Sequence, residues 1–148
     1  MDLKAIVQRI ELFQGLNDKQ IEQIIDIGRE HTYAKDAEVF SQGSAGEAMY
    51  IIGTGQVEIQ IDAGGGKTFS PVYLGSGQVF GEMALVDQGT RSASVVVVED
   101  DTTIYRLPAE DLTALCASDT AIGYIIMRNL AQDISFKLRH QNLLATNK

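Results

Sequence analysis

The sequence contains one cysteine and two histidines among its 148 residues. Cys116 has no partner for an internal disulfide, and the apolar segment ALC around it is typical of a small buried side chain in a reducing compartment. His31 and His140 lie far apart and outside the expected strands, which argues against a metal centre of clustered histidines. The same scarcity leaves no base for a Ser-His-acid triad. We therefore expect no bound metal, no catalytic residues and no enzymatic activity.

Positive charge and long apolar runs are also scarce. Twelve Lys and Arg against twenty Asp and Glu give a net charge of −8, which repels nucleic acid and anionic membrane surfaces. The opening MDLKAIVQRIELF lacks the continuous apolar core of a signal peptide, and no later run approaches the roughly 18 apolar residues that span a bilayer. The composition predicts a cytoplasmic protein with neither nucleic acid nor membrane as a partner of this chain.

The length and the 45% hydrophobic content fit a single domain, residues 1–148, with a packed core. Residues 1–37 are expected to form N-terminal helices, because apolar residues recur there at helical spacing. A capping box of Asn17 and Gln20 predicts a second helix from that point to about Glu30. The apolar positions are Leu3, Ile6, Val7 and Ile10 in the first helix, and Ile21, Ile24 and Ile25 in the second.

Between residues 38 and 107 the pattern changes to short β-rich runs separated by glycines, which is typical of a sandwich or barrel of short strands. VEIQI alternates and places Ile59 and Ile61 on one face. The run VVVV, 95–98, is apolar throughout and predicts a central or helix-covered strand. The segment DAGGGKT, 62–68, ends like a P-loop, but the pattern needs a glycine where Ile61 stands. We interpret it as the tip of a hairpin.

After Pro108 the helical period returns, so residues 108–145 are expected to form C-terminal helices. Their apolar residues recur in steps of four, and such a stripe drifts around a helix. The N-terminal part of the stripe is therefore expected to contact the barrel, and its C-terminal part a different surface. Two interpretations stay open, a seam between two copies of the chain and a cap over the barrel. The stripe is Ile122, Ile126, Leu130, Ile134 and Leu138, and it follows Leu112 and Leu115.

The segment GEMALVDQGTRSAS, residues 81–94, combines features of an anion site. Gly81 precedes a possible helical turn whose free N–H groups a ligand could approach closely. Arg91 can hold two phosphate oxygens with its fork of donors. Glu82 would be repelled by a phosphate, so it fits either as the acceptor of a ligand hydroxyl or as the partner of Arg91. A sugar hydroxyl beside a phosphate suits both groups, whereas a plain surface ion pair is worth only about 0–1 kcal/mol.

The stretch FGEMALVDQGTRSASV resembles the phosphate-binding cassette of the cyclic nucleotide-binding domain family, which reads F-G-E-φ-A, a short loop, then R-x-A and an apolar residue. ELFQGLNDKQIEQI resembles the N-terminal helices of that family, and GSAGEAMYIIGTGQVEI resembles its strand, glycine turn and strand. The resemblance implies an α+β, mainly β fold. This fold is a cyclic nucleotide-binding β-roll, or jelly-roll-like barrel, with N-terminal helices, a short cassette helix within residues 80–95, and a C-terminal helix.

Carried over by position, the resemblance implies a ligand site for cAMP or cGMP. Glu82 is expected to accept from the ribose 2′-hydroxyl, and Arg91 to bind the exocyclic oxygens of the cyclic phosphate. Ser92 is expected to add a hydroxyl donor, and contact between Ser92 and the base of a syn ligand would favour cGMP without excluding cAMP. The other implied ligand-binding residues are Phe80, the region of Gly81, Met83 and Ala84 for backbone amides, and Ile59 and Val72, which pack against either the base or the core.

The C-terminal segment ISFKLRHQN departs from the catabolite activator type, which has adjacent hydroxyl residues there that read adenine across a dimer. Here Lys137, Leu138 and Arg139 stand in that region, and Arg139 joins the candidate ligand-binding residues. The resemblance implies a non-enzymatic sensor that signals by movement of its C-terminal helix, with a homodimer or an unidentified protein as partner. The alternatives are a ligand-independent dimerisation or docking module and the sensor part of a truncated transcription regulator.

Overall fold

The N-terminal helices are confined to a shorter region than expected. The computed structural model describes residues 2–62, 64–65, 68–87 and 89–146. It begins with helix α1 (Leu3–Arg9), the 3₁₀ helix η1 (Glu11–Phe13) and helix α2 (Asp18–Ile27). The capping box is confirmed, since the side chain and backbone of Asn17 exchange hydrogen bonds of 2.9 Å with Gln20.

Helix α2 ends at Ile27 rather than near Glu30, and residues within the expected helical region 1–37 form strand β1 (Arg29–Tyr33). Gly28 lies between the two, where a Cβ would overlap the ring of Tyr105. Strand β1 is exposed at most positions and exists because it pairs with β8 along its whole length. This pairing is tertiary, so the local sequence pattern did not indicate it.

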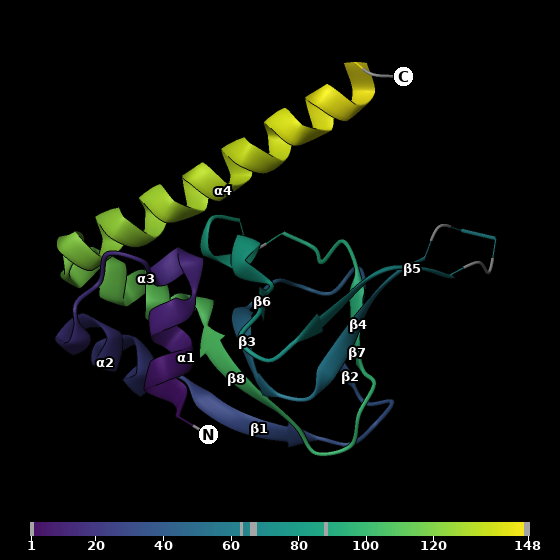
Figure 1. Ribbon diagram of the computed structural model, residues 1–148, viewed down its shortest axis with the longest axis horizontal. Coiled ribbons are helices and arrows are strands. Elements are labelled where there is room, and N and C mark those ends of the chain that lie inside the picture. Colours follow the sequence, from purple (N-terminus) through teal and green to yellow (C-terminus); the bar gives the residue numbers. More distant parts are fainter. Residues whose placement is uncertain (1, 63, 66–67, 88, 147–148) are drawn as a thin grey trace.

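Within the part of the chain that the structure describes, eight strands form two four-stranded antiparallel sheets, with the orders β1-β8-β3-β6 and β2-β7-β4-β5. The sheets face each other as a jelly-roll-like roll rather than a closed barrel, which confirms the predicted α+β fold class (Figure 1). The remaining strands are β2 (Glu38–Phe40), β3 (Ala48–Thr54), β4 (Gln56–Asp62), β5 (Thr68–Gly75), β6 (Val79–Phe80), β7 (Ser94–Val97) and β8 (Thr102–Pro108).

The predicted central strand is confirmed as β7, which lies between β2 and β4. Only one of its faces is fully covered, because Val95 and Val97 are buried while Val96 is half-buried. Strands β4 and β5 pair antiparallel, as expected for a hairpin around DAGGGKT. Residues 63, 66 and 67 of that tip lie outside the described residues.

Strand β3 divides the core in two, because it is buried on both faces. Met49 and Ile51 pack into a cluster with the helices, whereas Ala48, Tyr50 and Ile52 point into the interior of the roll. Alternation along a strand sends successive side chains to opposite faces, which explains this division. The candidate site described below lies on the interior side.

The chain ends in helices α3 (Ala109–Ser118) and α4 (Thr120–Thr146). The apolar stripe of α4 drifts as predicted, since Ile122, Ile126 and Leu130 are buried but Leu138 is 56% exposed. The side-chain amide of Asn129 donates to carbonyls of Leu12 and Gln14, both at 2.9 Å, and fixes α4 to η1. Figure 1 shows the last turns of α4 extending away from the other elements. Among the described residues, no helix is both long and apolar enough to cross a membrane.

Burial along the stripe on α4 predicts how substitutions there change the free energy of unfolding. Ile126→Ala should lower the free energy of unfolding by about 2–5 kcal/mol, because the side chain is 0% exposed in the helix cluster. Leu138→Ala, three turns later on the same stripe, should change the free energy of unfolding of the monomer by less than about 0.5 kcal/mol, because the side chain is 56% exposed. Urea unfolding followed by circular dichroism measures both variants, and equal losses would contradict this account of the core.

Candidate ligand-binding site

The cassette begins with a tight turn that requires glycine. Gly81 has φ of 76° and leads into the 3₁₀ helix η2 (Glu82–Leu85), which confirms the predicted helical turn. A Cβ on Gly81 would lie 2.9 Å from Nη1 of Arg91 and 3.1 Å from the carbonyl oxygen of Ala48. The glycine thus serves both the left-handed backbone and the close approach of the arginine.

Arg91 enters the roll because its backbone is held by the neighbouring loop. Its N–H donates to the carbonyl of Ser44 at 2.7 Å, and its carbonyl accepts from the N–H of Gly43 at 2.8 Å. The side chain points inward and only 9% of the residue is exposed. A guanidinium is rarely buried to this extent unless a partner is provided for its charge.

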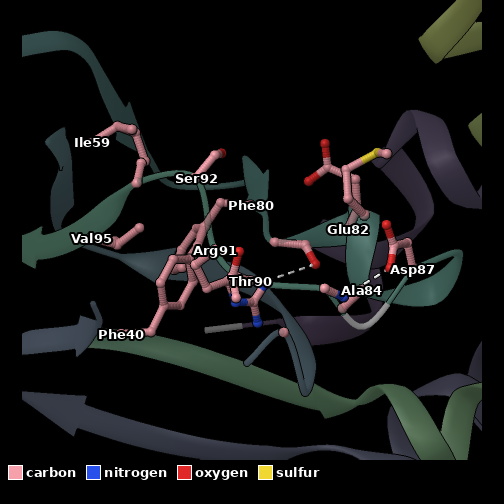
Figure 2. Close-up of a pocket in the computed structure, with 15 residues that line it drawn as sticks. Phe40, Ile59, Phe80, Glu82, Ala84, Asp87, Thr90, Arg91, Ser92 and Val95 are labelled. Atoms are coloured by element: carbon pink, nitrogen blue, oxygen red, sulfur yellow. Dashed lines mark hydrogen bonds between the residues drawn. The ribbon is translucent and has the colours of Figure 1, made fainter. Parts of the chain in front are cut away.

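The partners of the Arg91 guanidinium are neutral. Nη2 donates to the carbonyl of Ala48 at 2.6 Å and Nη1 to the carbonyl of Gly81 at 3.3 Å, while the buried Nε has no hydrogen-bond partner. The ring of Phe40 lies 4.1 Å from Cζ (Figure 2). Burial lowers the pKa of Arg91, although a guanidinium stays protonated in proteins. The site therefore holds a desolvated positive charge with an unused donor, which is suited to an anion.

Glu82 is not the partner of Arg91. Although the structure describes both residues, no ion pair joins them, and Oε1 of Glu82 instead lies 3.7 Å from Nζ of Lys137 on α4. The interpretation of Glu82 and Arg91 as a mutual surface ion pair is therefore wrong. Figure 2 shows Arg91 beside Phe40, with Glu82 on the other side of the cavity. This arrangement leaves room between the acid and the base for a ligand that contacts both.

A cavity of about 220 Å³ opens between the cassette and the roll interior. It brings together most of the residues predicted from the sequence. Eight of them line it, namely Ile59, Phe80, Gly81, Glu82, Met83, Ala84, Arg91 and Ser92. The N–H of Ala84 is already used by the carbonyl of Gly81 at 3.2 Å, so it is not a free donor here.

Two predicted residues lie elsewhere. Val72 pairs with Ile59 across β4 and β5, but it is 41% exposed and does not line the described cavity. Arg139 lies on the exposed part of α4 and borders a separate groove with Phe136. The structure therefore does not bring Val72 or Arg139 to the cassette.

The cavity also has residues that sequence reasoning missed. Phe40 comes from β2, and only the pairing of β2 with β7 brings it next to Arg91. Asp87 and Thr90 lie within the cassette loop itself and line the cavity. Their position between Glu82 and Arg91 was a signal that could have identified them.

Comparisons with known proteins agree with this geometry. The family model of the cyclic nucleotide-binding domain matches residues 30–119. A cyclic AMP receptor protein from Thermus thermophilus is 34% identical over 132 residues, which are 89% of this chain and 59% of that protein. A cAMP-dependent protein kinase regulatory subunit from Emericella nidulans is 34% identical over 113 residues, 71% of this chain and 27% of that protein.

A solved structure agrees as well. The crystal structure of the Thermus thermophilus catabolite activator protein superposes with a TM-score of 0.81 at 33% identity, over 92% of this chain and 62% of that one. The chain thus spans less than two thirds of these relatives. It belongs to the cyclic nucleotide-binding domain family, as the cassette residues predicted.

The close approach at Gly81 can be tested by substitution. Gly81→Ala should lower the melting temperature more than Gly77→Ala does, because Gly77 has a similar φ of 83° but nothing within 4 Å of a Cβ. The matched backbone strain costs about 1–2 kcal/mol in each variant, so the difference reports the contact with Arg91 and Ala48. Equal melting temperatures would contradict the close packing described for the cassette.

Proposed function

We propose that this chain is a non-enzymatic sensor that binds a 3′,5′-cyclic mononucleotide, cAMP or cGMP. The observation that carries the proposal is the buried guanidinium of Arg91, which lines the cavity, has no carboxylate partner and leaves its Nε without a hydrogen bond. A cyclic phosphate supplies one negative charge and exocyclic oxygens that match the arginine fork. The names of the relatives, a cyclic AMP receptor protein and a cAMP-dependent kinase subunit, support the same class of ligand.

The cavity provides for the rest of the ligand. Glu82, on the far side from Arg91, accepts from the ribose 2′-hydroxyl, and Ser92 adds a hydroxyl at the rim. Ile59 and Phe80 give an apolar surface for the base. When phosphate binds, Arg91 exchanges its bonds with the carbonyls of Ala48 and Gly81 for stronger charge-assisted ones.

The signal then passes through η2 to α4. Ala84 and Leu85 are buried in the same cluster as Ile126 and Leu130 of α4, so a shift of η2 changes the packing of that helix. Met83 and Val86 are 49% and 60% exposed, so the proposed transmission uses Ala84 and Leu85 rather than these two residues. A ligand that binds one position of η2 better than another thereby biases the position of α4.

The exposed side of α4 suits a second copy of the chain or another protein partner. Tyr124 and Leu138 are 67% and 56% exposed, and with exposed Ala131 they recur every seven residues along one side of the helix. This spacing is typical of a helix–helix seam. A ligand-independent dimerisation module would use the same surface, but it would not need the buried charge of Arg91.

Thermal unfolding with added nucleotides tests the proposed ligand. At 100 times its dissociation constant, cAMP or cGMP should add about 2.7 kcal/mol of stability and raise the melting temperature by several degrees. 5′-AMP and cyclic dinucleotides should do little, because they do not present a single cyclic phosphate beside a 2′-hydroxyl. No shift with either cyclic mononucleotide would favour the ligand-independent module.

Variants of the site serve as controls for this experiment. Arg91→Met should cost at least about 2 kcal/mol of binding, since it removes the partner of the phosphate. Glu82→Gln should cost less, because the amide oxygen still accepts from a hydroxyl. An unreduced ligand shift in folded Arg91→Met would remove the arginine from the proposed site.

Sedimentation velocity tests the seam on α4. If two copies associate there, Leu138→Ser should shift the protein toward the monomer, because the substitution removes exposed apolar surface from the seam. Val72→Ser is the matched control, since Val72 is 41% exposed on β5. A monomeric unchanged chain, or equal shifts in both variants, would contradict a dimer through α4.

A further inference from the structure

The charge balance of the ligand cavity is unfavourable for an anion. Among the described residues that line it, Glu82 and Asp87 are acids and Arg91 is the one base. A cyclic phosphate bound to Arg91 would therefore lie near two carboxylates in a chain of net charge −8. Like charges repel more strongly where water is partly excluded. A further cation next to these carboxylates would strengthen ligand binding.

Lys137 on α4 provides such a cation. Its Nζ lies 3.7 Å from Oε1 of Glu82 and 2.9 Å from Oδ2 of Asp133, which is one turn earlier on the same helix. The side chain of Glu82 is 19% exposed and that of Lys137 is 60% exposed, so the carboxylate is partly withdrawn from solvent while the ammonium is not. The hydrogen bond to Asp133 and the charge of Glu82 raise the pKa of Lys137, so the ammonium remains charged.

Glu82 stands between two cavities. It lines the ligand cavity and also a second cavity of about 160 Å³, which α4 borders with Lys137, Asp133 and Leu130. A carboxylate has two oxygens and can accept several hydrogen bonds. Glu82 can therefore accept a ligand hydroxyl on one side while it binds the ammonium on the other. The second cavity leaves Lys137 room to approach more closely.

We propose that Lys137 is a positioning residue of the ligand site, shared between Asp133 and Glu82, and that ligand binding shifts it toward Glu82. The negative charge of a phosphate near Glu82 makes the position beside Glu82 more favourable for the ammonium than before. Because Asp133 belongs to α4 whereas Glu82 belongs to η2, the shift replaces a contact within α4 by one between α4 and the cassette. This inference rests on the proposed function and adds an ionic link to the packing of Leu85.

Affinity measurements on four variants test the link, with cAMP and cGMP as probes in isothermal titration calorimetry at low salt. Lys137→Met should weaken binding about threefold to fivefold, which is the range of a partly exposed ion pair. Asp133→Asn should strengthen binding, because it frees Lys137 for Glu82. Asp133→Asn should have no effect in the Lys137→Met background, while Lys137→Arg should bind like the unchanged chain.

Two further readouts distinguish the link from general electrostatics. Bound ligand should slow amide hydrogen exchange in residues 130–140 of the unchanged chain, and less so in Lys137→Met. Lys4 gives a matched control, since its Nζ lies 3.3 Å from Glu22 and 3.8 Å from Asp18 on the N-terminal helices. Lys4→Met and Asp18→Asn make the same charge changes and should leave affinity unchanged.

The possible results separate the two proposals. Equal or tighter binding by Lys137→Met, or an effect of Asp133→Asn that persists without Lys137, would overturn the role of Lys137 and leave the sensor function standing. Failure of the unchanged chain to bind either nucleotide would overturn the sensor function, and the role of Lys137 with it.

Discussion

The burial of one guanidinium is the constraint on which the rest of the site depends. Arg91 is 9% exposed, and among the described residues its guanidinium contacts two backbone carbonyls and the aromatic rings of Phe40 and Tyr50. Burying the guanidinium in this way costs free energy because the charge loses its hydration, and a bound anion would offset that cost. Gly81 leaves room for this side chain because it has no Cβ, and the inward face of β3 lies beside it in the interior of the roll.

Around Arg91 the fold divides its core into two clusters, one in the roll and one with the helices. The interior of the roll, lined by Tyr50 and Phe80, supports the ligand cavity, whereas the opposite face of β3 packs against the helices. Helix η2 is the element common to both, since its residues line the cavity and also enter the helix cluster. The four residues of η2 thus share a packed cluster with the 27-residue helix α4.

The electrostatics of the site extend past the cassette. Glu82 does not meet Arg91 but turns to Lys137, so the acid of the cassette is linked to α4 and the base to the roll. The two charges are thus held apart by different parts of the molecule. This separation explains why Glu82 and Arg91, which are nine residues apart in sequence, line a cavity instead of forming an ion pair.

The cassette, the capping box at Asn17, the central strand within 95–98 and the drifting stripe of α4 were all predictable from the sequence. These features are local, because they depend on spacing, on glycine and on side-chain chemistry within a few residues. Three other features could not be predicted in this way: residues 29–33 form a strand, Phe40 covers Arg91, and Lys137 reaches Glu82. Each of these depends on segments distant in the chain, and the pairing energy that fixes them does not appear in any local pattern.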